Sequence, residues 1–85
     1  MQVIDVNFHV TWEMPVYIRI GGGSRERIDG PDAALSVLSN RWPVSNSGEL
    51  ETAKRFCLAA ITRHGSTALA RTSFIDAAVA AKVFA

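Results

Sequence analysis

Apolar and polar residues alternate along the first dozen positions of the chain. The apolar residues occupy every second position, at Ile4, Val6, Phe8, Val10 and Trp12. A period of two over five apolar positions is typical of a strand with one face on the core and the other in water. Beyond residue 15 the alternation resumes, at Val16, Ile18 and Ile20. Because Pro15 has no amide proton, it suits the opening of this second strand or an edge position.

A glycine-rich tract then predicts a chain reversal. Gly21 to Ser24 reads Gly-Gly-Gly-Ser, and glycine accepts the positive φ of a tight turn. The tract lacks the following helix and the lysine of a phosphate loop, so we interpret it as a hairpin turn. A short returning strand is expected over about residues 25–28, with Arg25 and Arg27 in water and Ile28 on the core. The three segments predict an antiparallel meander, in which the first segment pairs either within its own subunit or with a partner's.

The segment after this hairpin carries the signals of a first helix. Pro31 suits the first helical position, and Asp32 in the first turn suits the positive end of the helix dipole. Apolar residues follow at helical spacing, at Ala34, Leu35, Val37 and Leu38. The helix should end near Arg41 or Trp42, because Pro43 moves the residue before it out of helical geometry.

Two further helices are predicted in the rest of the chain. Asn46 or Ser47 suits the N-cap of the first of them. Its apolar face is formed by Leu50, Ala53, Cys57, Ala60 and Ile61. Gly65 should end this helix, and Ser66 or Thr67 should open a last helix that runs nearly to the C-terminus. The larger apolar residues of that last helix are Leu69, Phe74, Ile75 and Val79, among many alanines.

The order of these elements, β-β-β-α-α-α, predicts an α+β fold. We expect a small antiparallel sheet of two to three strands packed against three C-terminal helices. A chain of 85 residues has room for one core, so residues 1–85 should form a single domain. Its composition, 48% apolar and 20% charged, is that of a globular protein.

Charge and targeting signals narrow the class of protein. Nine basic and eight acidic side chains give a net charge of +1, which excludes a strongly basic nucleic-acid binder. The N-terminus alternates instead of forming the apolar run of a secretory signal. No stretch approaches the roughly 20 apolar residues of a membrane span. A single cysteine excludes a disulfide framework, and we therefore expect a cytoplasmic protein.

The chemically reactive side chains do not form a catalytic set. Cys57 lies in mid-helix on the apolar face, where cysteine is a small core residue without a base to activate it. His64 precedes Gly65 and suits the C-terminal end of a helix, with no carboxylate placed beside it. One cysteine and two distant histidines offer no metal-ligand spacing. We expect a protein that is not an enzyme and holds neither a metal nor a cofactor.

Two hypotheses of function, from different classes, remain open. The first is a small interaction or regulatory domain that binds a protein partner or forms a homodimer. Its candidate residues are Trp42 and Pro43, because a tryptophan at a helix end either packs on the core or stays exposed as an interface anchor. The Ala-rich last helix raises the same choice, since alanines allow close helix approach within one subunit or between two.

The second hypothesis is a binder of a small anionic ligand or of nucleic acid, of which nucleic acid is the less favoured ligand. The charge is uneven, since residues 1–40 carry −2 and residues 41–85 carry +3. A modest basic patch on the second and third helices has as its candidates Lys54, Arg55, Arg63, His64 and Arg71. Part of that charge should pair along the helix, because Glu51 and Arg55 are spaced i, i+4 in the favourable order.

Several short segments of the chain match one pattern. They read "PVYI" at 15–18, "PDAALSVL" at 31–38, "RWP" at 41–43, "AKRFCLAAI" at 53–61, "AR" at 70–71 and "FIDAA" at 74–78. In this order they resemble the family named domain of unknown function 982, small proteins found chiefly in soil and plant-associated bacteria. The resemblance covers roughly residues 12 to 81 and implies a compact α+β domain. It implies no reaction, ligand or catalytic residue.

Overall fold

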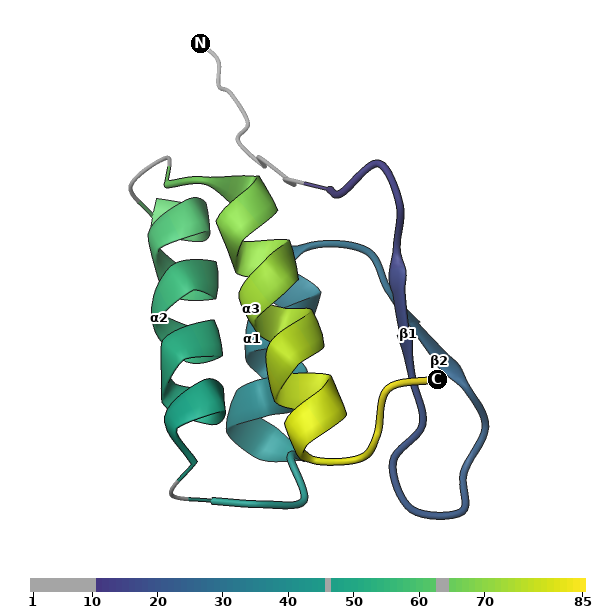
Figure 1. Ribbon diagram of the computed structural model, residues 1–85. Coiled ribbons are helices and arrows are strands. Elements are labelled where there is room, and N and C mark those ends of the chain that lie inside the picture. Colours follow the sequence, from purple (N-terminus) through teal and green to yellow (C-terminus); the bar gives the residue numbers. More distant parts are fainter. Residues whose placement is uncertain (1–10, 46, 63–64) are drawn as a thin grey trace, which may run out of the picture.

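The computed structural model describes residues 11–45, 47–62 and 65–85. Its elements are β1 (Val16–Ile18), β2 (Glu26–Ile28), α1 (Pro31–Asn40), α2 (Gly48–Thr62) and α3 (Thr67–Ala80). The three helices stand together, and the hairpin of β1 and β2 lies on the side of α3 and α1 away from α2 (Figure 1). The predicted α+β arrangement is therefore confirmed, and α1 ends shortly before Pro43, as expected.

The two strands form an antiparallel hairpin, as the sequence pattern predicts. Val16 pairs with Ile28, and both side chains are buried, so one face of the hairpin lies on the core. At the turn the Gly23 amide donates to the Ile20 carbonyl at 3.3 Å. Gly21, at the first central position, has φ +64°, which an L side chain rarely adopts. The Gly-rich tract is therefore a hairpin turn.

The sheet has two strands where the sequence pattern predicts three. Most of the expected first strand, residues 1–10, lies outside the described residues. At its described end Trp12 is buried, and its amide donates to the Asp29 carbonyl at 2.7 Å. Among the described residues, this single backbone bond beyond the end of β2 is not part of a strand ladder.

The C-terminus lies along the flank of β1. Ile18 forms an isolated antiparallel bridge with Phe84, and the Arg19 amide donates to the Val83 carbonyl at 2.8 Å. The last helix runs nearly to the C-terminus, as predicted: it ends at Ala80, and the remaining residues return to the sheet.

A Schellman motif at the end of α3 turns the C-terminal residues back toward β1. The Lys82 amide donates to the Val79 carbonyl at 3.1 Å, and the Val83 amide donates to the Ala78 carbonyl at 2.9 Å. Lys82 itself has φ 62°, in the left-handed region that favours glycine. Because Val83 is buried, the turn directs the tail onto the sheet.

Serine side chains open the second and third helices as the sequence predicts. The Ser47 hydroxyl accepts from the Leu50 amide at 3.1 Å, and the Ser66 hydroxyl accepts from the Leu69 amide at 3.0 Å. Each bond satisfies one of the amides that a helix N-terminus leaves without a partner. Asn46, the alternative cap of α2, lies outside the described residues.

Gly65 follows α2 at a point where the backbone passes close to the helix. Its amide donates to the Ala59 carbonyl at 3.0 Å. A Cβ atom at this position would lie 3.1 Å from the Ala59 Cβ. The close approach between the chain and the last turns of α2 therefore favours glycine here, since a larger residue would have to displace Ala59.

Phe74 lies at the centre of the core and is fully buried. Its ring centroid is 6.0 Å from that of Trp12 and 5.8 Å from that of Trp42, both in tilted arrangements. Around this cluster the helices meet through small buried residues: Ala53, Cys57, Ala60, Ala70, Ala77 and Ala78. The aromatic cluster joins the segment before β1, the segment after α1 and the middle of α3.

Three aliphatic residues that the helical patterns place among the core positions are exposed. Ile61 lies at the last turns of α2, and Leu69 and Val79 lie on α3. On α3 the face against its neighbours is occupied by Ala70, Ser73, Phe74, Ala77 and Ala78. Because the helices approach through alanines, the larger aliphatic side chains are left on the outside.

Replacement of Phe74 by alanine should reduce the free energy of unfolding by about 3–5 kcal/mol, since it removes a fully buried ring between two others. Urea denaturation checks this value. The control is Phe84→Ala, whose ring is 51% exposed and whose loss should change the free energy by no more than about 0.5 kcal/mol. Equal losses for the two variants would contradict the central place of Phe74.

Candidate functional site

Trp42, one of the two candidate interaction residues, lies against the core. It is half-buried and packs on Phe74, and its Nε1 atom is buried without a hydrogen-bond partner among the described residues. Pro43, the next residue, is exposed. The indole is therefore mainly a packing group that fixes the chain after α1, and a binding role for the pair stays a prediction.

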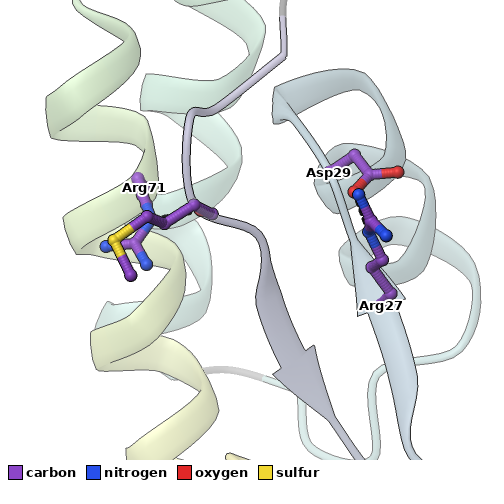
Figure 2. A network of polar contacts seen from close by, with 4 residues as sticks. Arg27, Asp29 and Arg71 are labelled. Atoms are coloured by element: carbon purple, nitrogen blue, oxygen red, sulfur yellow. Dashed lines mark hydrogen bonds and ion pairs between the residues drawn. The ribbon is translucent and has the colours of Figure 1, made fainter.

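The residues of the predicted basic patch lie on different surfaces. Lys54 and Arg55 lie on α2 beside α1. Arg71, on α3, points to the segment before β1, where its Nε donates to the Met14 carbonyl at 2.8 Å (Figure 2). Arg63 and His64 lie outside the described residues. Of the five candidates, the structure thus brings Lys54 and Arg55 together and places Arg71 elsewhere.

The hydrogen bond of Arg71 belongs to a contact that fastens the start of the described chain to α3. In the same hollow, the Trp12 indole donates to the Thr67 carbonyl at 2.9 Å. Both bonds reach backbone carbonyls across more than fifty residues of sequence. Arg71 therefore has a structural task that its position in the sequence does not indicate.

Lys54 and Arg55 line an open groove between α1 and α2, with a volume of about 600 Å³. Its lining residues are Leu35, Ser39, Glu51, Lys54, Arg55 and Leu58. We call this the α1–α2 groove. A second hollow, lined by Arg55, Leu58, Ala59 and Thr62, shares two of these residues and extends the surface toward the end of α2. Leu58, common to both hollows, is 50% exposed.

The rim of the α1–α2 groove carries more positive than negative charge. Glu51 Oε2 lies 4.0 Å from Lys54 Nζ, an exposed i, i+3 contact that contributes little stability. The expected i, i+4 pair of Glu51 with Arg55 is not the one formed, because the carboxylate lies beside Lys54. Within the described ranges, Arg55 makes no ion pair. The groove therefore combines apolar side chains with a guanidinium that forms no ion pair among the described residues.

Leu58 is the residue of this groove that the sequence analysis misses. The stripe that predicts α2 runs through Leu50, Ala53, Cys57 and Ala60, and these residues are all buried. Leu58 lies about 100° around the helix from Cys57, so it falls outside the stripe. A large aliphatic residue off the buried face is the signal that identifies it.

Another hollow, of about 290 Å³, lies between the start of α2 and the second half of α3. It is lined by Gly48, Glu49, Thr52, Ser73 and Asp76. The buried Ser73 hydroxyl donates to the Ala70 carbonyl at 3.1 Å, so it is held within its own helix. In the part of the chain that the structure describes, no three His, Cys, Asp or Glu side chains are grouped to hold a metal ion.

Cys57 is a core residue, as its position in the helix predicts. It is fully buried, and burial raises the pKa of its thiol to about 12 because the thiolate loses its hydration. At neutral pH the group is an uncharged thiol within the helix packing. It therefore lacks the thiolate that nucleophilic or metal-binding chemistry requires.

The comparisons with known proteins identify a family and a fold. Residues 14–85 match the family described as "Protein of unknown function (DUF982)". The NMR structure of Agrobacterium tumefaciens protein Atu1219 superposes with a TM-score of 0.77 at 29% sequence identity. The match covers 100% of this chain and 86% of that one. No curated protein matches the sequence.

A membrane-spanning segment is also absent from the described ranges. None of the helices there has the length and the apolar character that crossing a bilayer requires.

The buried thiol predicts an alkaline loss of stability. The unfolded thiol ionises near its ordinary pKa of 9.0, whereas the folded thiol holds its proton to about pH 12. Between these values the unfolded state binds fewer protons, so the free energy of unfolding falls as pH rises, by up to about 1.4 kcal/mol per pH unit.

Urea denaturation from about pH 8 to about pH 11 measures this slope. Cys57→Ala is the matched variant, because it keeps every other titrating group and removes the thiol. Its free energy of unfolding should decline less steeply than that of the wild type. Parallel curves for the two proteins would contradict the raised pKa of Cys57.

Proposed function

The chain belongs to the DUF982 family, a family of proteins of unknown function, and we propose that it is a non-enzymatic interaction domain. Its α1–α2 groove binds an amphipathic helix of a protein partner that carries apolar anchors and acidic flanking residues. The observation that carries the proposal is the half-exposed Leu58 between α1 and α2, with Lys54 and Arg55 beside it.

Position in the fold supports the choice of this surface. The outer side of α2 is turned away from the hairpin (Figure 1), so the described elements leave that side uncovered. Leu58 and Leu35 supply apolar contact area from two adjacent helices. A groove between two helices is the surface into which an amphipathic helix places its apolar residues.

Charge supports an acidic partner. Lys54 and Arg55 lie on the rim of the α1–α2 groove, and the one carboxylate there, Glu51, is shared with Lys54 at 4.0 Å. Acidic residues flanking the apolar anchors of a partner would meet Arg55 without displacing an existing ion pair. Such complementarity raises the association rate and discriminates against basic partners.

A second copy of the chain fits this groove less well. An antiparallel twofold pairing of α2 that buries Leu58 against its copy sets Arg55 of one chain opposite Ile61 of the other. Neither carboxylate at the start of α2, Glu49 or Glu51, then reaches that guanidinium. We therefore favour a different protein over the homodimer, which stays a prediction with its own test below.

We also propose that the protein is bacterial and cytoplasmic. A bacterial source is supported by the Agrobacterium protein with a similar structure. A reducing cytoplasm is supported by the single thiol, which is buried and unpaired. The proposal of a non-enzymatic role is supported by Cys57, whose high pKa keeps it unreactive at neutral pH.

The test uses two fluorescent peptides of about 18 residues, long enough to form a helix when bound. Both have leucines along one face; one has glutamates on the flanks, and the other has lysines at the same positions. The wild-type protein should bind the glutamate peptide. Leu58→Asp should weaken that binding at least about tenfold, since it removes the apolar anchor point and adds a repelling charge.

Leu69→Asp is the control, because Leu69 is 52% exposed, against 50% for Leu58, and lies on α3 outside the groove. Its affinity for the glutamate peptide should equal that of the wild type. Equal losses in both variants, or equal binding of the two peptides by the wild type, would contradict the proposed groove.

The charge of the rim gives a second prediction. The double variant Lys54→Glu/Arg55→Glu should exchange the preference, binding the lysine peptide better than the glutamate peptide. The fluorescence titration at low and moderate salt measures both affinities, and the preference should weaken as salt screens the charges. A preference that survives the charge reversal would show that the rim does not select the partner.

Light scattering separates the partner from a second copy. A monomer at all accessible concentrations agrees with the proposal. A concentration-dependent dimer that Leu58→Asp abolishes and Leu69→Asp does not would instead assign the α1–α2 groove to self-association.

A further inference from the structure

Two exposed arginines flank the base of the glycine turn. The last paired residues of the hairpin are Ile18 and Glu26. The next residue toward the turn is Arg19 on one side and Arg25 on the other, and both are exposed. Positive charge is therefore concentrated where strand pairing ends.

The second arginine is held in place by an aromatic ring. The Arg25 guanidinium carbon lies 4.4 Å from the centroid of Tyr17, which is on the opposite strand. A guanidinium stacked on a ring keeps its N–H groups at the edge free to donate. Arg25 is thus oriented before any ligand arrives.

The carboxylates of the hairpin are already bound to other arginines. Arg27 Nε donates to Asp29 Oδ1 at 2.6 Å, as Figure 2 shows, and this bond raises the pKa of Arg27 above its ordinary value. Glu26 accepts from the Arg41 guanidinium at 2.6 and 2.7 Å. Among the described residues, no carboxylate remains for Arg19 or Arg25.

A third cation comes from the end of α3. Lys82 directly precedes Val83, whose carbonyl accepts from the Arg19 amide at 2.8 Å, so the backbones of Lys82 and Arg19 are neighbours. Lys82 has φ 62°, a conformation in which glycine is the favoured residue. A lysine at such a position carries a conformational cost that a role for its side chain accounts for.

The turn beside these cations is open. A Cβ atom at Gly21 or Gly22 would have no heavy atom within 4 Å, so the tip of the hairpin stands clear of the rest of the described chain. Backbone amides at such a glycine tip can approach a ligand closely. The glycine turn is therefore open to solvent beside the cations at its base.

We propose that Arg19, Arg25 and Lys82 form a binding site for the terminal phosphate or pyrophosphate group of a small molecule. Phosphate carries about two negative charges and accepts from an arginine fork in two parallel hydrogen bonds. A bound phosphate would neutralise part of the positive charge at the base of the turn. A nucleic-acid strand fits less well, because Arg25 already occupies a face of Tyr17 on which a base would stack.

The experiment titrates the intact protein with inorganic pyrophosphate while amide chemical shifts are followed by NMR. Shifts are expected at residues 19–25 and 82–83. Arg25→Gln should weaken pyrophosphate binding at least about tenfold, because it removes the oriented guanidinium. Arg27→Gln is the control and should bind as the wild type does, because Arg27 is an exposed arginine of β2 whose guanidinium is already paired with Asp29 at 2.6 Å. Shifts spread over all basic residues, or equal losses in the two variants, would overturn the site.

The variant Lys82→Gly distinguishes a binding role of the Lys82 side chain from a purely structural role of this residue in the turn. Glycine suits φ 62°, so this variant should raise the melting temperature by about 4 °C. It should also lower the affinity for pyrophosphate, since it removes a cation. A variant that gains stability and keeps full affinity would remove Lys82 from the site.

A single-stranded dT oligonucleotide of about ten residues is the last arm of the experiment. Weaker binding of the oligonucleotide than of pyrophosphate supports a small phosphorylated ligand. Tighter binding that Arg25→Gln abolishes would assign the three cations to a nucleic-acid backbone and overturn the proposal as stated.

Discussion

The packing of Phe74 between Trp12 and Trp42 is the constraint on which the rest of the structure depends. The three rings come from α3, from the segment before β1 and from the segment after α1, with centroids 5.8 and 6.0 Å apart. Phe74 is the largest fully buried side chain among the described residues, and the two indoles that pack on it are large as well, so these rings supply much of the apolar area that an 85-residue chain can remove from water. The hairpin, α1 and α3 are thereby fixed relative to one another, and α2 adds to this unit through α3 and α1.

The small residues of the helices determine what is left for binding. Because α2 and α3 approach through alanines and Cys57, most of the large aliphatic side chains of these helices are left exposed, with Leu50 as the buried exception. Leu58 and Leu69 are about equally exposed, yet only Leu58 lies in a groove with cations on its rim. Exposure alone therefore does not distinguish the two residues; the neighbouring helix and the charges do.

Local signals predict the elements of this fold well. Ser47 and Ser66 cap their helices, Pro43 limits α1, and the glycine turn joins two strands, because each effect acts within a few residues of sequence. The C-terminal segment, residues 81–85, has no such local signal. Its pairing with β1 depends on Lys82 adopting a positive φ and on Val83 reaching the core, and neither has a periodic signal. The α1–α2 groove is likewise not predicted by local signals. The sequence identifies Lys54 and Arg55 as candidate residues, but their separation from Arg71 depends on which faces of the helices pack together.

The arrangement of the helices also makes the two proposed surfaces independent. The α1–α2 groove is lined by residues of α1 and α2 alone. Arg19 and Arg25 instead flank the turn of the hairpin, which lies on the side of α3 and α1 away from α2 (Figure 1). Residues that share no partner change the free energy additively, so a substitution at one surface should not alter binding at the other. Coupling between them would have to pass through the aromatic cluster, because Trp42 follows α1 and Phe74 lies on the helix whose C-terminal turn holds Lys82. A close-packed core of this kind transmits a displacement only if its rings have a second arrangement, so a rigid cluster leaves the domain with two separate binding faces.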